Sequence, residues 1–220
     1  MKPRVLDNII GRIILPGQMS VVHGEERFPL TAIAHSVVIG AAMANRNAIY
    51  LDSGSNFSPQ LGRVLCGTDS NQSLHRIKIG SVFNLTDVED LVVQSQGIDS
   101  IAVIVLDSLT SVLNMSRPPG TKERQRELFR TLEVVRGVVL DTNIHMMLTD
   151  HSARNWLTGE SRPIGGNVIE HAVDTVIGVS TLSEINEGVK VCVERTPIIP
   201  NPGGVIVRLG HRGIRSLKAA

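Results

Sequence analysis

The chain has 220 residues and a net charge of +1, with 42% hydrophobic and only 3% aromatic residues. This length suits one α/β domain with a sizeable core, which must be built from aliphatic side chains. The near-neutral charge excludes a global field that would draw the chain to nucleic acid or membrane, so any such attraction must come from a local patch. No apolar run is long enough to span a bilayer, no N-terminal signal is evident, and two cysteines without metal spacing favour a reduced, intracellular protein.

Short apolar runs alternate with helical patterns along most of the chain. Strands are predicted at 19–23, 48–52, 74–79, 101–106 and 144–149, and helices at 31–44, 86–96 and 123–141. After residue 172 only strands and turns follow, with strands at 175–180, 189–194 and 205–209. The alternation predicts an α/β fold with a central, mostly parallel twisted sheet flanked by helices, extended by further strands at the C-terminal end. Segments 114–121 and 152–167 are predicted loops.

Residues 24–31 have the frame of a phosphate-binding P-loop, G-x-x-x-x-G-K-[ST], with its central residues replaced. Gly24 and Thr31 match the first and last positions, but Pro29 replaces the second glycine and Leu30 replaces the lysine. A P-loop holds phosphates with backbone N–H groups and a lysine charge. Proline has no N–H and leucine has no charge, so the frame predicts a degenerate nucleotide site. The alternative interpretation is an ordinary structural loop.

An apolar strand that ends in Asp107 and Ser108 has the Walker B pattern, in which the aspartate orients a magnesium ion. Alone the pattern is weak, because many buried strands end in an aspartate that caps a loop. It follows the P-loop frame by about 80 residues, which is a plausible spacing within one nucleotide-binding sheet.

With these two motifs in place, the chain resembles the RecA/RadA-type recombinases and their paralogues over nearly its whole length. The resemblance implies a RecA-like core over residues 1–220, without a separate N-terminal DNA-binding domain. Six segments match the family's motifs in chain order: 24–35, 50–57, 106–110, 124–125, 149–151 and 163–167.

The departures from the family pattern imply a loss of hydrolysis. By resemblance, Leu30 replaces the lysine that reaches the phosphates, Gly54 replaces the glutamate that activates water, and His151 replaces the glutamine that senses the γ-phosphate. Losing these roles removes transition-state charge stabilisation and water activation. We therefore expect a pseudo-ATPase with no cofactor, in which Asp107 is a structural cap and Pro29 and Leu30 form an apolar rim. Binding of ATP with magnesium is the disfavoured alternative.

Two segments are candidate DNA contacts. By resemblance, the first DNA-binding loop and its helix include Arg117, Lys122 and Arg124, and the second loop includes Arg154, Trp156 and Arg162. Trp156 is the only tryptophan and could stack on a base. The alternative for the helix is a solvated face with Arg/Glu pairs, and for the loop a contact with a partner protein.

The leading hypothesis is a non-catalytic RecA/RadA-like accessory subunit for homologous recombination and DNA repair, cytoplasmic or nuclear. Its partners would be another subunit of the family or a second copy, and single-stranded DNA. Two alternatives remain: a nucleotide-binding regulatory ATPase of KaiC-like type with an unorthodox P-loop, and a structural module without DNA contact.

Overall fold

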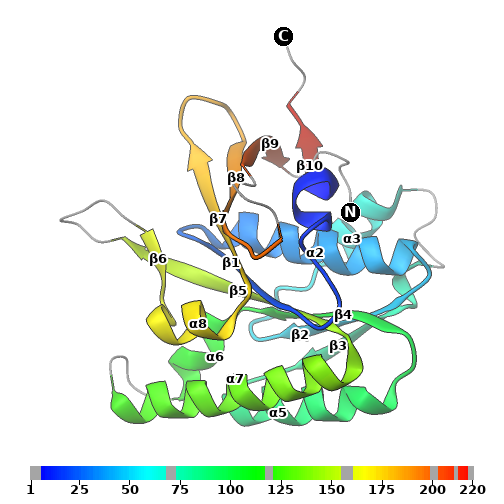
Figure 1. Ribbon diagram of the computed structural model, residues 1–220. Coiled ribbons are helices and arrows are strands. Elements are labelled where there is room, and N and C mark those ends of the chain that lie inside the picture. The colour runs from blue at the N-terminus through cyan, green and yellow to red at the C-terminus, as the bar shows by residue number, and fades with distance from the viewer. Residues whose placement is uncertain are drawn as a thin grey trace.

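The computed structural model describes residues 6–67, 73–116, 121–154, 161–198, 203–210 and 213–217. One large twisted sheet runs through the middle of the molecule, and helices cover both of its faces (Figure 1). Nine strands lie side by side in the order β10-β9-β8-β7-β1-β5-β4-β2-β3, and a short strand, β6, pairs with β5. This architecture confirms the α/β fold with a mostly parallel sheet.

The parallel part of the sheet consists of strands that are connected through helices. These strands are β1 (Met19–Gly24), β2 (Asn47–Asp52), β3 (Ile77–Ser81), β4 (Ile101–Asp107), β5 (His145–Arg154) and β7 (Thr175–Leu182). The remaining strands pair antiparallel: β6 (Ser161–Pro163), β8 (Gly188–Arg195), β9 (Gly204–Gly210) and β10 (Gly213–Ser216). The central strand β1 is buried along its whole length, as expected for a strand covered on both faces.

The helices form two layers. One face of the sheet carries α2 (Arg27–Met43), α3 (Pro59–Cys66) and the short π-helix η1 (Asp7–Gly11). The other face carries α5 (Leu85–Gln94), α6 (Leu109–Ser116), α7 (Lys122–Thr142) and α8 (Gly166–Ala172), and the 3₁₀ turn η3 (Ser95–Gly97) follows α5. Each layer buries its own aliphatic cluster against the sheet, and the only tyrosine, Tyr50, lies in the α2 cluster.

Most of the predicted elements are confirmed, and the differences have local causes. The predicted helix start at Thr31 is wrong, because α2 begins at Arg27. The predicted loop 152–167 is partly wrong, since it contains the end of β5, β6 and the start of α8. The strand predicted at 74–79 begins only at Ile77. In the part of the chain that the structure describes, no helix is both long and apolar enough to cross a membrane.

Candidate functional site

The connection between β1 and α2 is only two residues long. β1 ends at Gly24 and α2 begins at Arg27, so only Glu25 and Glu26 lie between them. Pro29 is in the first turn of α2, where the missing N–H group leaves no intrahelical hydrogen bond unmade. The segment that would wrap around phosphates is instead helical.

The motif residues in this turn are packed into the protein. Leu30 is 1% exposed and belongs to the cluster between α2 and the sheet, and Pro29 is also buried. The predicted apolar rim is therefore wrong for Leu30, which faces the core. Gly24 also has a structural explanation, because a Cβ atom there would lie 2.5 Å from the carbonyl oxygen of Val179 on the neighbouring strand β7.

The carboxylate of Asp107 is held by hydroxyl groups of the protein. Thr31 donates to Oδ2 at 2.8 Å, Thr149 donates to Oδ1 at 2.7 Å, and the hydroxyl of Tyr50 donates to Oδ2. Asp107 is 1% exposed, so these donors replace water around it. Burial, and then the negative charge of Asp107, raise the pKa of Tyr50, which keeps the phenol protonated and donating. Three hydroxyl groups from three different elements therefore satisfy this buried carboxylate within the fold.

The loop after β2 closes over the end of β4. The backbone N–H of Ser53 and the amide of Asn56 donate to the carbonyl oxygen of Asp107 at 3.0 and 2.9 Å. The N–H of Ser108 donates to the hydroxyl of Ser53 at 2.7 Å, and the Asp107–Ser108 peptide bond is cis. Gly54, at the position of the family glutamate, accepts a hydrogen bond from Arg27 at 3.0 Å. An arginine of α2 therefore covers the place expected for the catalytic carboxylate.

His35 completes this edge as a neutral, buried ring. Its Nδ1–H donates to the carbonyl of Thr31 at 2.8 Å, and its Nε2 accepts from the N–H of Ser58 at 2.9 Å. The ring stacks on Phe57 with centroids 4.9 Å apart. Burial lowers the pKa of His35 despite the nearby carboxylates. These contacts give His35 a structural role at this edge of the sheet.

A second buried carboxylate, to which the sequence motifs assigned no role, lies in the middle of β5. Asp150 is fully buried, and its oxygens accept from the hydroxyl of Thr110 and, at 3.0 Å, from the N–H of Gly165. Burial raises the pKa of Asp150. Thr110 also accepts from the backbone N–H of His151 at 2.7 Å. Asp150 therefore ties the segment before α8 to β5, a role signalled by the polar residues that follow a buried strand.

A Ser–His–Glu set that residue spacing did not suggest lies across β5, β1 and β8. His23 is hydrogen-bonded through Nδ1 to Ser152 at 2.8 Å and through Nε2 to Glu194 at 2.9 Å. A Cβ atom on Gly178, in the intervening strand β7, would lie 2.1 Å from the Glu194 carboxylate. These contacts hold the end of β5 against the antiparallel strands.

The candidate DNA residues fall into three groups. Arg117, Trp156 and the side chain of Arg154 lie outside the described residues. Lys122, at the start of α7, and Arg162, in β6, are exposed. Arg124 differs from both groups, because it is only 7% exposed on the inner side of α7.

Arg124 lies against a cavity and is incompletely hydrogen-bonded. Its Nη2 donates a long, 3.4 Å hydrogen bond to Asn114, while its buried Nη1 has no hydrogen-bond partner within the described part of the chain. The cavity of about 320 Å³ is lined by Leu113, Arg124, Gln125, Leu128 and residues 164–168. We call it the Arg124 cavity. It joins two motifs that are distant in sequence, the Arg-Gln pair of α7 and the glycines before α8.

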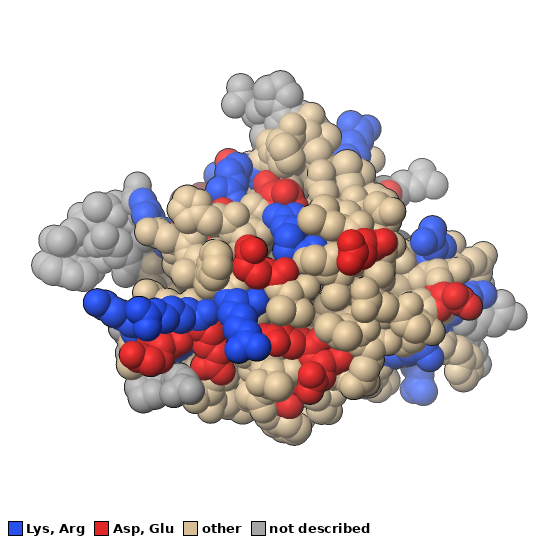
Figure 2. Space-filling model, turned by 60° about the horizontal axis from the view of Figure 1, so that its bottom comes forward, with Lys and Arg blue, Asp and Glu red and all other residues tan. Residues whose placement is uncertain are grey.

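The outer face of α7 is a mixed-charge surface. Arg126 and Arg130 border a groove that also contains Glu89, Glu123 and Glu127. Figure 2 shows basic and acidic side chains interleaved on the side of the molecule where α5 and α7 lie. The alternative of a solvated helix face therefore describes these residues, whereas Arg124 points inward.

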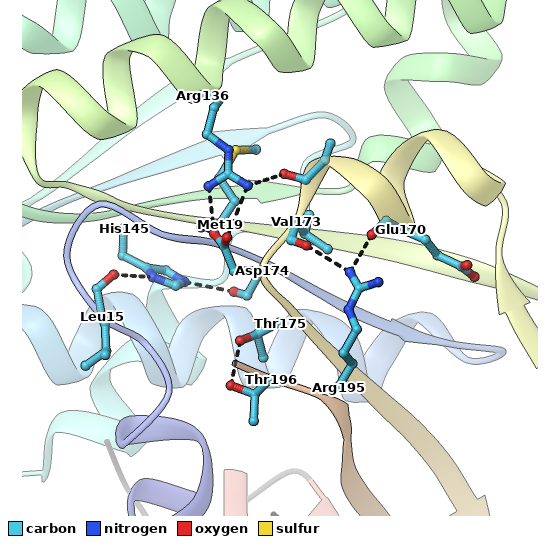
Figure 3. A network of polar contacts seen from close by, with 12 residues as sticks. Leu15, Met19, Arg136, His145, Glu170, Val173, Asp174, Thr175, Arg195 and Thr196 are labelled. Atoms are coloured by element: carbon cyan, nitrogen blue, oxygen red, sulfur yellow. Dashed lines mark hydrogen bonds and ion pairs between the residues drawn. The ribbon is translucent and has the colours of Figure 1, made fainter. Parts of the chain in front are cut away.

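Two arginines fix the end of α8 (Figure 3). Arg136 of α7 donates to both oxygens of Asp174, at 2.7 and 3.3 Å, and to the carbonyl of Ala172 at 2.7 Å. Burial opposes ionisation of Asp174, but the hydrogen bonds from Arg136 and the N–H of Met19 outweigh it and lower the pKa of this carboxyl. Arg195 of β8 donates to the carbonyls of Val173, at 2.8 Å, and Glu170. These contacts hold the C-terminal end of α8 in place, and the other end of the same short helix lines the Arg124 cavity.

Comparisons with known proteins agree with this geometry. The model of the Rad51 family matches residues 2–215. The DNA repair and recombination protein RadB of Thermoplasma acidophilum is 22% identical over 195 residues, covering 87% of this chain and 83% of that protein. The DNA repair protein RAD51 of Mycosarcoma maydis is 21% identical over 95% of this chain and 67% of its own length. The crystal structure of the RadB recombinase has the same fold, with a TM-score of 0.79, 18% identity and coverage of 97% of this chain and 96% of that chain.

Proposed function

Because the chain belongs to the Rad51 family, we propose that it acts in DNA repair by homologous recombination as an accessory subunit that binds single-stranded DNA and does not hydrolyse ATP. The observation that carries the proposal is the two-residue connection from β1 to α2, in which the phosphate-binding segment has become helix. Relatives named for DNA repair and recombination support the biological setting.

The absence of hydrolysis is proposed from the chemistry of the first turn of α2. Phosphoryl transfer depends on electrostatic stabilisation of the phosphates by loop N–H groups, a lysine and a magnesium ion. At the corresponding positions, Leu30 packs in the core and Asp107 is saturated with hydroxyl donors. Restoring activity would require changes in several elements at once.

Binding of single-stranded DNA is proposed from the Arg124 cavity. A buried guanidinium with an unpaired nitrogen is costly unless a ligand supplies an acceptor. A backbone phosphate is suitable, since arginine and phosphate form short, charge-assisted hydrogen bonds. Exposed Lys122, at the start of the same helix, adds positive charge beside it.

The DNA half is tested by fluorescence anisotropy with a labelled oligothymidylate. Arg124→Leu is expected to weaken binding by about tenfold to a hundredfold, because one charge-assisted phosphate contact is lost. The slope of log affinity against log salt should become shallower by about 1. The matched control is Arg130→Leu, an exposed arginine of the same helix, which should bind like the wild type. Equal losses in both variants would contradict the assignment.

The catalytic half is tested with the intact protein. We expect no magnesium-dependent ATP turnover, with or without single-stranded DNA, above that of a buffer control. Calorimetric titration with ATP separates this proposal from a KaiC-like regulatory ATPase. Micromolar affinity that requires magnesium would support the regulatory ATPase and overturn the accessory role.

A partner subunit is proposed to add a strand at β3. Among the residues that the structure describes, this edge strand pairs only with β2, so its outer backbone groups are available for another strand. Ile79 and Phe83 beside this edge are 52% and 64% exposed, which is unusual for large apolar side chains. If a second copy docks there, Ile79→Lys should shift the sedimentation of the wild-type protein towards the monomer, while Val93→Lys on nearby α5 should not. If the wild-type protein is monomeric, the partner at the β3 edge would instead be a different subunit of the family.

A further inference from the structure

A groove lies between the first turn of α2 and the hairpin formed by β7 and β8. It consists of two adjoining cavities of about 310 and 480 Å³, which share Glu26, Pro29 and Thr181 in their linings. We call it the α2–β7 groove. It lies beside the degenerate phosphate motif, on the same face of the sheet as α2.

The charge of the α2–β7 groove is opposite to that needed for a nucleotide. Glu25 and Glu26 line it, and none of its described lining residues is a lysine or an arginine. Both glutamates are exposed, and Glu26 accepts a hydrogen bond of 2.6 Å from the hydroxyl of Thr181. They stand immediately before the 17-residue helix α2, whose N-terminal end is a favourable place for negatively charged side chains. A bound triphosphate would face these two carboxylates, whereas a cation would be attracted.

The rest of the groove is mixed and partly open. Ser161, Ser180, Ser183 and Glu187 also line it, with Glu187 paired to Arg215 at 2.8 Å, and apolar side chains line much of the larger cavity. Phe28, in the first turn of α2, is 49% exposed and lines the larger cavity. The same cavity has a wall of aliphatic side chains from the β7–β8 hairpin and β9: Leu182, Ile185, Val189 and Leu209. An exposed aromatic ring next to an aliphatic wall is a typical anchor site for an apolar side chain of a protein partner.

We propose that the α2–β7 groove docks a segment of a partner protein in which a lysine or arginine stands next to an apolar side chain. The cation would meet Glu25 and Glu26, and the apolar side chain would pack on Phe28 and the hairpin. Charge complementarity selects this occupant over an acidic segment or a nucleotide. The inference rests on the partner half of the proposed function and does not depend on DNA binding.

The probe is a fluorescein-labelled hexapeptide, acetyl-Gly-Phe-Arg-Phe-Lys-Gly, titrated with the full chain and followed by anisotropy. We expect saturable binding that weakens about tenfold in the double variant Glu25→Gln, Glu26→Gln, since two exposed ion pairs are lost. Phe28→Ser should also weaken binding. The matched control is Glu184→Gln, an exposed glutamate of the same hairpin that does not line the groove.

Four results would overturn the inference. The first is equal binding of the peptide to the wild type and the double glutamine variant, and the second is equal binding of a peptide with both basic residues replaced by glutamate. The third is no saturable binding at millimolar protein, and the fourth is displacement of the peptide by magnesium ATP. Oligothymidylate binding, measured on the same preparations, should be unchanged in all groove variants, so that failure here is distinguishable from failure of the proposed DNA site.

Discussion

The degenerate phosphate motif and the Arg124 cavity differ in how completely their buried polar and charged groups are hydrogen-bonded. At the degenerate phosphate motif, Asp107 accepts from three hydroxyls and His35 uses both ring nitrogens. At the Arg124 cavity, an almost fully buried guanidinium keeps one nitrogen without a partner. Polar groups satisfied within the protein stabilise the fold, whereas a buried unsatisfied cation is costly and favours a ligand. We therefore expect a ligand at the Arg124 cavity rather than at the degenerate phosphate motif.

Asp107→Ala tests the degenerate phosphate motif, where the buried groups are satisfied, and should have the largest effect on stability. The change leaves the hydroxyls of Thr31, Tyr50 and Thr149 without their acceptor in the core, and we expect the free energy of unfolding to fall by about 4 kcal/mol. Urea denaturation followed by circular dichroism measures it. A loss below about 1 kcal/mol would mean that the hydroxyl network is not structural.

Acidification tests the buried histidines. Burial lowers the pKa of His35, and at the opposite edge it lowers that of His145 to about 4. Both folded-state values lie below the ordinary value, so the unfolded chain binds more protons as the pH falls. Their stability contribution is complete above pH 6.5 and is lost as the pH falls towards 4, by about 3 kcal/mol for His145. The pH dependence of urea midpoints should flatten in His145→Gln; an unchanged slope would assign the effect to other groups.

Arg124→Leu tests the Arg124 cavity and should raise stability, whereas Asp107→Ala should lower it. Removing a buried, incompletely paired cation is expected to raise the free energy of unfolding by about 1 kcal/mol. The same variant is expected to lose single-stranded DNA affinity, so stability and binding should change oppositely. If the variant is clearly destabilised instead, the guanidinium is a structural group, and the Arg124 cavity does not differ from the degenerate phosphate motif in the way proposed.

Arg27→Ala should have the smallest effect. Its hydrogen bond to the carbonyl of Gly54 is exposed, and its loss should cost less than about 0.5 kcal/mol. Thermal melts of this variant and of Arg46→Ala, another exposed arginine that donates to a carbonyl, should overlap. A large difference would show that Arg27 holds the loop after β2 in place.

The sheet was predictable because aliphatic runs and helical spacing alternate regularly, and the strand that ends in Asp107 was located correctly. The start of α2 was predicted incorrectly, because the P-loop frame places it at Thr31. The helix begins earlier, at Arg27, because Pro29 is well suited to a first helical turn. Burial of Arg124 could not be read from a helix rich in Arg and Glu, because its inward direction depends on packing against the residues before α8. Asp150 was passed over because a hydrogen bond to Gly165 joins residues whose proximity only the fold creates.

The central position of β1 has a consequence for synthesis of the chain. Ser20 pairs with Met147 on one side and with Thr175 on the other, so the strand made first is flanked by strands made much later. A nascent chain that has not yet exposed β7 from the ribosome has an aliphatic strand with an open edge. Such long-range pairing folds slowly and leaves apolar surface exposed meanwhile. Premature termination before residue 175 should therefore yield aggregation-prone fragments that depend on chaperones, even though most of the helices are already complete.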